Sequence, residues 1–335
     1  MAILTVQEMK DLACGVLGAV GVPEDTARLV ADELTLAELD GLPSHGMTRL
    51  TFYADHVKSG KVLVDARPVV TRPRPGAILV DACHGFAYPA IDIGLREGVA
   101  AARKEGTCAV AVRRSHHCGM LGHFVERTAK EGLVGLAFAS TPAAMAPWGG
   151  SRPVFGTNPI AFGCPRKDDD PIVVDMSLTP VARGKIIIAK QRGESIPTGW
   201  ARDAQGRDTT DPAEALKGTM LPMGGAKGAA LALMVELLAG TLTGSLHGTE
   251  ASSFFDTQGG PPGVGQFFLL VDPAAFNPDF ATRVEDVCRS VLDQEGTRLP
   301  GMRRVAGRRE REAKGVDVPD ALLGELRRRA TEGSG

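Results

Sequence analysis

One short segment of the chain places a serine, a histidine and an arginine close together: Ser44, His45 and Arg49. Pro43 and Ser44 are typical of a helix start, so we expect His45 and Arg49 on one helical face. Arginine binds carboxylates through two charge-assisted hydrogen bonds, and histidine exchanges protons near neutral pH. The pair suits a 2-oxo acid, whose developing alkoxide or amine the histidine would protonate. The spacing alone favours the simpler interpretation, a serine helix cap with histidine and arginine on the surface.

A second polar cluster covers residues 113–119 and contains His116, His117 and Cys118. It follows a strand-like run, CAVAV, and polar turns at the carboxyl ends of strands commonly contact ligands. A metal site built from these histidines with His123 and Glu126 is conceivable. Adjacent histidines point in different directions, however, and no carboxylate cluster completes a shell, so we expect no metal here.

A third set of short motifs combines glycines with lysine or aspartate: G-T-N-P (156–159), D-M-S (175–177), G-K (184–185) and G-G-A-K-G (224–228). Glycines beside a lysine at the start of a helix let the backbone approach a phosphate, with Lys227 supplying positive charge. Turn formation alone would explain most of these motifs.

The elements that must position these clusters can be read from periodicity and caps. Thr5 and Glu8 form a capping box, and Pro23 opens a second helix that Gly41 ends. Short β-branched runs at 77–80, 108–112 and 172–174 alternate with helical stretches near 89–105 and 122–131. Turn residues dominate 149–225. Helical patterns return at 229–243 and after Pro278. The helix at 229–243 is apolar on nearly every face, so it must be buried in the core or against another subunit.

Composition excludes several classes of protein. The chain has 335 residues, 43% of them hydrophobic, and a formal net charge of -2. It can bury a full core, and its charge gives no general attraction to nucleic acid or anionic lipid. No apolar run reaches the roughly 20 residues of a membrane helix, and the first residues do not resemble a secretion signal. The six cysteines form no Cys-x-x-Cys pair. We expect a cytoplasmic protein without nucleic-acid or membrane partners.

Several familiar catalytic motifs are missing from the chain. The nearest approach to G-x-G-x-x-G begins at Gly263, lacks its third glycine and runs into a strand-like FFLLV. A dinucleotide would therefore bind to a fold other than the Rossmann fold. No P-loop, H-E-x-x-H or G-x-S-x-G motif occurs either, which disfavours phosphoryl transfer, zinc proteolysis and serine hydrolysis.

Seven motifs in one order resemble the malate/L-lactate dehydrogenase-like oxidoreductases over about residues 5–310. They are E-x-D-G-x-x-S-H-G-x-x-R (38–49), S-H-H-x-G, G-T-N-P, D-M-S, A-R-G-K, G-W-A-x-D-x-x-G-x-x-T-T-D-P and P-x-G-G-x-K-G. The resemblance implies a mixed α+β fold, with a helical lobe and a largely antiparallel central sheet that binds NADH or NADPH without a Rossmann domain. It also implies a homodimer or higher assembly. We expect a helical substrate lobe at 1–70, a central cofactor and catalytic domain at 71–245, and a return strand with C-terminal helices at 246–335.

The resemblance also assigns roles to individual residues. His45 matches the proton donor, Ser44 its orienting partner and Arg49 the carboxylate binder, while His117 matches a second acid or base. Thr157, Arg183 and Gly184 match substrate contacts. The implied cofactor contacts are His117, Cys118, Gly119, Met120, Leu121, Ser140, Asp175, Met176, Ser177, Gly225, Lys227, Arg303 and Arg304.

The expected reaction is hydride transfer at C2 of a small 2-oxo or 2-hydroxy carboxylic acid, similar to malate, lactate or sulfolactate. The alternative is reduction of a cyclic ketimine 2-carboxylate, Δ1-pyrroline- or Δ1-piperideine-2-carboxylate. Lys185 stands where the cyclic-imine reductases carry aspartate, which favours the oxo acid. The chain has no lysine near Ser140, so a role that some relatives give to a lysine there does not carry over. A non-enzyme alternative is a silent dinucleotide- or metabolite-binding protein.

Overall fold

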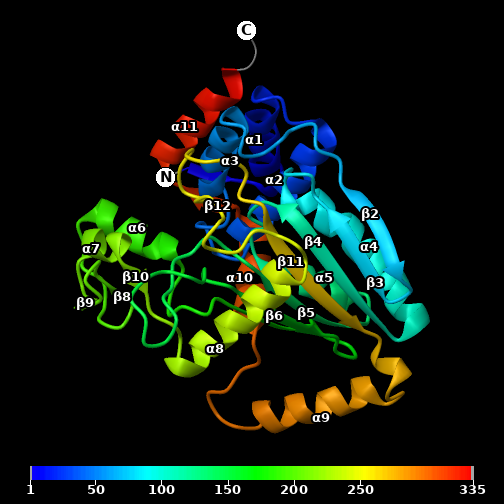
Figure 1. Ribbon diagram of the computed structural model, residues 1–335. Helices are drawn as coiled ribbons and strands as arrows, with labels where there is room; N and C mark the ends of the chain where they lie inside the picture. Colours follow the sequence, from blue (N-terminus) through cyan, green and yellow to red (C-terminus); the bar gives the residue numbers. More distant parts are fainter. Residues whose placement is uncertain (1, 333–335) are drawn as a thin grey trace.

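A seven-stranded sheet forms the centre of the computed structural model, which describes residues 2–332 (Figure 1). The strand order is β2-β3-β4-β11-β5-β6-β7, and only the β3–β4 pair is parallel. The strands are β2 (Val69–Arg74), β3 (Ala77–Asp81), β4 (Thr107–Ser115), β5 (Val134–Ala139), β6 (Ile160–Cys164), β7 (Ile172–Met176) and β11 (Val264–Val271). The expected, largely antiparallel sheet is confirmed.

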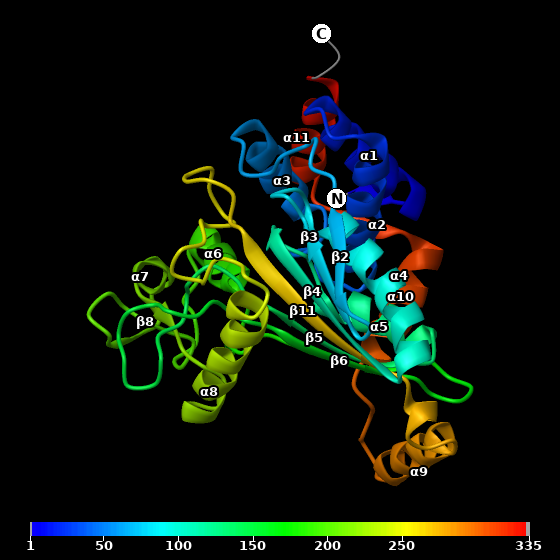
Figure 2. The same cartoon turned by 45° about the vertical axis from the view of Figure 1, so that its right-hand side comes forward.

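Both faces of this sheet are covered by helices (Figure 2). On one face lie α4 (Ala87–Glu105) and α5 (Leu121–Lys130); on the other lies α8 (Ala226–Val235), which continues as the π-helix η1 (Glu236–Thr241). Successive side chains of β11 point to opposite faces of the sheet: Phe268 and Leu270 join the core beneath α4, whereas Phe267 packs toward α8 and η1.

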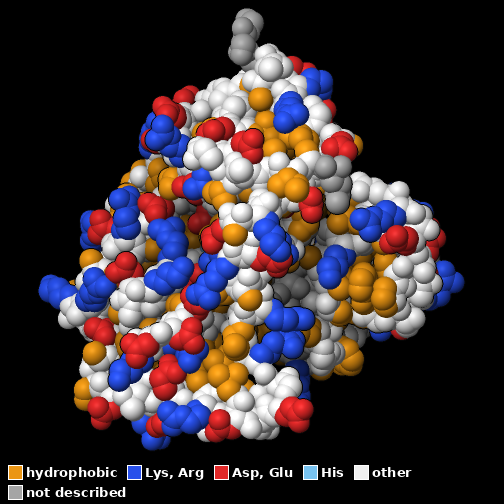
Figure 3. Space-filling view, turned by 180° about the vertical axis from the view of Figure 1, so that it is seen from behind, with side chains coloured by type: hydrophobic (Ala, Val, Ile, Leu, Met, Phe, Trp, Pro, Cys, Tyr) orange, Lys and Arg blue, Asp and Glu red, His pale blue; other side chains and the backbone are white. Residues whose placement is uncertain are grey.

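The helical lobe joins both ends of the chain. It contains α1 (Val6–Ala19), α2 (Glu24–Leu39), α3 (Thr48–Lys58) and α11 (Asp320–Thr331), with β1 (Ala2–Leu4) paired to β12 (Val316–Val318). The capping box of Thr5 and Glu8 is present, and Pro23 and Gly41 flank the second helix as expected. The C-terminal helix α10 (Met302–Lys314) packs against α2. Acidic and basic side chains intermingle on the surface seen from behind (Figure 3).

A small lobe with its own apolar core lies beside the sheet. It contains α6 (Arg183–Arg192), α7 (Pro212–Lys217) and the strands β8 (Ala201–Arg202), β9 (Asp208–Thr209) and β10 (Thr219–Met220). The short helix η2 (Pro273–Ala275) and α9 (Phe280–Leu292) follow β11. No helix of the described residues is long and apolar enough to cross a membrane. The proposed boundaries at residues 70 and 245 stay a prediction.

One local expectation was wrong. The helix containing Arg49 begins at Thr48, and residues 43–47 form turns, so His45 does not share a helical face with Arg49. Just before this helix, Glu38 of α2 accepts a hydrogen bond from the backbone N–H of Met47 (2.7 Å). The expected helix at 229–243 is present as an α-helix followed by a π-helix. Several of its large apolar side chains are exposed in the single chain, so its burial against another subunit stays a prediction.

Candidate active site

Two adjoining cavities meet beside the turn that carries His45. The larger, with a volume of about 900 Å³, lies between the start of α5, the end of β7 and residues 296–304. The smaller lies between α3, the start of α6 and residues 253–255. His45, Gly119 and Thr157 line both cavities. A cofactor in the large cavity and a small molecule in the other could therefore meet at this junction.

Arg49 is held so that its outer nitrogens stay available. Its Nε donates to the carbonyl of Ser44 (2.8 Å), and its Cζ lies 4.7 Å from the ring centroid of Phe255. Within residues 2–332, its Nη1 and Nη2 atoms have no hydrogen-bond partner in the protein. The Ser44 hydroxyl lies 3.1 Å from Nδ1 of His45, which fits an orienting role. Ser44 itself lines neither cavity, so it would act through His45.

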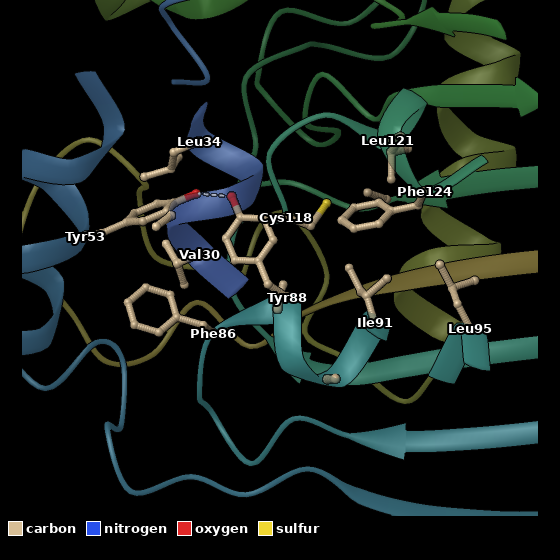
Figure 4. Close-up of a cluster of buried hydrophobic side chains, with 14 of the residues drawn as sticks. Val30, Leu34, Tyr53, Phe86, Tyr88, Ile91, Leu95, Cys118, Leu121 and Phe124 are labelled. Atoms are coloured by element: carbon tan, nitrogen blue, oxygen red, sulfur yellow. Dashed lines mark hydrogen bonds between the residues drawn. The ribbon is translucent and has the colours of Figure 1, made fainter. Parts of the chain in front are cut away.

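The hydrogen bonds around His117 define its neutral tautomer. The backbone N–H of Gly119 donates to Nδ1 (3.3 Å), and the Tyr53 hydroxyl lies 2.7 Å from the same atom. Since an N–H can only donate, Nδ1 is the acceptor and Nε2 carries the proton. Tyr53 in turn bonds Tyr88 (2.9 Å), the pair drawn in Figure 4. His117 stacks on His45 with the ring centroids 5.7 Å apart.

Both imidazoles are neutral at neutral pH in the free protein. Burial and the Arg49 guanidinium lower the pKa of His45 to about 3, and the same two causes lower the pKa of His117. An anion bound to Arg49 would offset the guanidinium's charge and raise both pKa values again. Binding of an anionic substrate would therefore favour protonation of both imidazoles, against the burial that is the larger cause of their lowered pKa values.

The large cavity contains most of the expected cofactor contacts: Gly119, Met120, Leu121, Asp175, Met176, Ser177, Arg303 and Arg304. Asp175 accepts a hydrogen bond from the backbone N–H of Gly122 (2.8 Å) at the start of α5. Arg303 is exposed, and neither it nor Arg298 has an ion pair among the described residues. These two free cations and the cavity's size fit a dinucleotide with its phosphates.

Arg304 is engaged differently from Arg303. Its guanidinium bonds Asp40 (3.1 Å) and Glu126 (2.8 Å), so it anchors α10 to α2 and α5. The same buried network includes His123, whose two nitrogens lie 2.8 Å from Glu33 and 3.0 Å from Asp40. His123 must donate from both nitrogens, so it is an imidazolium at neutral pH.

Some expected residues lie elsewhere. Gly225 and Lys227, at the start of α8, line neither of the two cavities, and Gly225 packs beside Trp148. Ser140 lines the smaller cavity, but its hydroxyl bonds the backbone of Gly265. Cys118, expected as a cofactor contact, lines the smaller cavity instead, and burial raises the pKa of its thiol to about 12.

Asn158, the asparagine of the G-T-N-P motif, has a structural role that its motif did not predict. Asn158 is fully buried, with φ of 37°, and its amide donates to Glu236 (2.9 Å) and the carbonyl of Ala232 (3.1 Å). Its side-chain oxygen accepts from the N–H of Thr141 (3.3 Å). Asn158 therefore fixes the two turns that place Thr157 and Thr141 at the cavity. Positive φ is tolerated better by asparagine than by most residues, which was the available signal.

The chain matches the family model for malate/L-lactate dehydrogenase over residues 4–327. It is 51% identical to the (2R)-3-sulfolactate dehydrogenase (NADP(+)) of Chromohalobacter salexigens, over 97% of each chain. It is 40% identical to the Δ1-pyrroline-2-carboxylate/Δ1-piperideine-2-carboxylate reductase of Pseudomonas aeruginosa, over 97% of this chain and 98% of that one.

Solved structures agree with these matches. A Δ1-piperideine-2-carboxylate reductase from Pseudomonas syringae superposes with a TM-score of 0.93 at 35% identity, covering 98% of this chain and all of that chain. A sulfolactate dehydrogenase from Methanocaldococcus jannaschii gives 0.91 at 29% identity, covering 99% and 98%. These similarities confirm the expected enzyme class, a dehydrogenase or reductase that uses NAD(P). The chain belongs to the malate/L-lactate dehydrogenase family.

Proposed function

We propose that this enzyme transfers a hydride between NADPH and C2 of a small 2-oxo acid that carries a second negative group. Oxaloacetate and 3-sulfopyruvate, the 2-oxo form of 3-sulfolactate, have this chemistry. One observation supports the proposal above the others: two guanidinium groups, Arg49 and Arg183, line the smaller cavity, and no Asp or Glu of the described chain lines it.

The charge of this cavity argues for two anionic groups. Arg183, like Arg49, has no ion-pair partner within the described residues. Burial lowers the pKa of both guanidinium groups, and for Arg183 the charge of Asp256 opposes this shift without reversing it. Partly buried cations without partners are costly until an anion binds. A substrate with one carboxylate would neutralise one of them, whereas a dianion would neutralise both.

Cyclic-imine reduction is the second candidate, favoured by relatives of 38–40% identity with that name. A protonated ketimine carries positive charge beside its single carboxylate, which fits a doubly cationic cavity less well. Lys185, which the resemblance set against an aspartate of those reductases, is exposed and lines neither cavity, so its position adds nothing to this choice. The 51% identical sulfolactate dehydrogenase supports the dianion.

Each group of the site has a proposed part in the reaction. NADPH, when bound, supplies the hydride. Arg49 binds the 2-carboxylate, and Arg183, with Thr157 and Gly184 beside it, binds the second anion. His45, oriented by Ser44, donates the proton to the oxygen on C2. His117 carries its proton on Nε2 and serves as the second donor or as a positioning group for the carbonyl.

The proposed position of NADPH follows the large cavity. Its nicotinamide end would reach the junction at His45 and Thr157, and its adenosine end would reach Arg298 and Arg303. Two free arginines suit the extra phosphate of NADPH. The relative named for NADP(+) supports this preference.

The proposed assembly is a homodimer. Leu231, Leu233, Met234, Leu237 and Leu242 of α8, η1 and the turn that follows expose 38–60% of their surface. Exposed apolar patches of this kind mark interfaces, and a second copy would bury them. Sedimentation that shows a monomer at micromolar concentration would contradict the dimer.

Six unpaired thiols support a cytoplasmic location.

The test is an initial-rate comparison with NADPH and NADH across four substrates: 3-sulfopyruvate, oxaloacetate, pyruvate and Δ1-pyrroline-2-carboxylate. We expect the highest kcat/KM for a dianionic 2-oxo acid with NADPH. A higher kcat/KM for the cyclic imine would favour the second candidate. Tight NADPH binding without turnover of any substrate would support a silent binding protein.

A further inference from the structure

A fully buried lysine lies behind the substrate cavity. Lys61, three residues after α3, exposes 0% of its side chain. Its Nζ donates three hydrogen bonds to backbone carbonyls of one segment: Ser253 (2.6 Å), Asp256 (3.0 Å) and Gln258 (3.0 Å). The nearest carboxylate, that of Asp256, is 3.8 Å away and half-exposed. An ammonium group has three donors, so this segment satisfies all of them.

Lys61 binds residues 253–258, a segment whose first three residues, 253–255, form one wall of the smaller cavity. The segment contains no helix or strand, so no ladder of backbone hydrogen bonds fixes it. Its Phe254 packs on His117, with ring centroids 5.2 Å apart. Its Phe255 lies under the Arg49 guanidinium and against the edge of Phe52, at 4.7 and 5.9 Å. Two of the proposed site residues therefore rest on this segment.

His56 adds a fourth hydrogen bond to the same wall. Its Nε2 lies 3.0 Å from the carbonyl of Asp256, which already accepts from Lys61. Its Nδ1 lies 3.0 Å from Nε2 of His116, the neighbour of His117. Both anchors, Lys61 and His56, come from the end of the helix that carries Arg49. The wall and the arginine are thus positioned by one element.

Burying an ammonium group is costly unless charged hydrogen bonds compensate for it. An apolar side chain could fill the same space but could not organise three carbonyls around one point. Lys61 lines neither of the two site cavities, so it does not touch cofactor or substrate. The ammonium group of Lys61 instead stabilises one conformation of residues 253–258, which have no helix or strand to hold them.

We propose that Lys61 is a positioning residue for substrate recognition. Its ammonium group holds residues 253–258 so that Phe255 fixes Arg49 and Phe254 fixes His117. This inference rests on the proposed function for the identity of the substrate, but the folding of the segment around Lys61 can be measured without any substrate.

The first experiment compares Lys61→Met with the wild type and with Lys58→Met. Lys58 is an exposed lysine of the same helix end, so it controls for loss of a positive charge. Amide hydrogen exchange followed by mass spectrometry should be faster in residues 251–260 of Lys61→Met alone. The KM for the 2-oxo acid should rise about ten- to 100-fold, because small misplacements of binding groups have effects of this size. NADPH affinity, from fluorescence titration, should change less than about threefold.

Two outcomes would overturn the proposal: unchanged exchange in residues 251–260, or faster exchange with an unchanged KM. If Lys61→Met does not fold, Phe255→Leu provides the test, since it removes the contact with Arg49 and leaves the buried charge intact. It must raise KM with NADPH affinity retained, and an unchanged KM contradicts the proposal. Failure of the wild type to reduce any 2-oxo acid would reject the proposed function, while the exchange experiment would still measure the role of Lys61.

Discussion

Replacing Arg183 by methionine should change which substrate the enzyme prefers. Arg183 is the first residue of α6, lines the smaller cavity and has no ion-pair partner in the described chain. Removing one charge-assisted hydrogen bond costs about 1.5–3 kcal/mol. At 1.36 kcal/mol per tenfold change, kcat/KM for 3-sulfopyruvate or oxaloacetate should fall about ten- to 150-fold. Pyruvate has no second anion, so its kcat/KM should change less than about threefold.

The assay is the initial rate of NADPH oxidation at saturating NADPH and at substrate concentrations below KM. Lys185→Met is the matched control, because Lys185 lies on the same helix end but is exposed and lines neither cavity. The control should keep the wild-type ratio of dianion to pyruvate. Equal losses for both substrates in Arg183→Met, or no loss for either, would refute the claim that Arg183 binds the second anionic group of the substrate.

Three further predictions follow from the site and its surroundings. His45→Ala should lower kcat about 100- to 10,000-fold with NADPH affinity nearly unchanged, whereas Arg49→Ala should chiefly lower kcat/KM for the acid; steady-state kinetics and fluorescence titration measure both. Arg303→Ala should weaken NADPH binding about tenfold and NADH binding little, by the same titration, since only NADPH offers the extra phosphate. Burial lowers the pKa of His123, but hydrogen bonds to Asp40 and Glu33 outweigh this effect and raise the pKa to about 9. The folded-state pKa is above the unfolded one, so this stabilisation is complete below about pH 6.5 and is lost as the pH rises through 9. Urea unfolding should show a loss of about 3 kcal/mol across that window in the wild type but not in His123→Gln.

Each of these predictions has an outcome that contradicts it. Near-normal turnover of His45→Ala, with turnover abolished in His117→Ala, would transfer the role of proton donor to His117. If Arg303→Ala weakened the binding of NADPH and NADH equally, Arg303 would not contact the extra phosphate of NADPH. Parallel pH profiles for the wild type and His123→Gln would show that His123 is not an imidazolium in the folded protein.

The sequence predicted which motifs converge, but not how they are held. His45, Arg49, His117 and Thr157 meet at one cavity, as the order of motifs implied. The local argument for a helix start at Pro43 failed: residues 43–47 form turns, and Glu38, nine residues earlier, accepts a hydrogen bond from the backbone N–H of Met47. No periodicity reports such a contact.

Long-range packing accounts for the other residues that the sequence did not reveal. Phe254 and Phe255 look like ordinary core residues in the sequence, and Lys61 looks like a surface lysine. Their roles depend on hydrogen bonds between residues 192 or more positions apart. Gly225 and Lys227 matched a cofactor motif, yet they line neither site cavity of this single chain. A motif match identifies residue types, whereas placement depends on the whole fold.

The most direct test of the central claim is a competition experiment with NADPH that carries deuterium at both hydrogen positions of C4 of the nicotinamide. Equimolar 3-sulfopyruvate and Δ1-pyrroline-2-carboxylate are incubated with the enzyme, and mass spectrometry counts deuterium at C2 of each product. The ratio of labelled products reports the ratio of kcat/KM values. We predict that most of the deuterium is found in 3-sulfolactate. Deuterium found mainly in proline would contradict the assignment of this cavity to a dianionic 2-oxo acid.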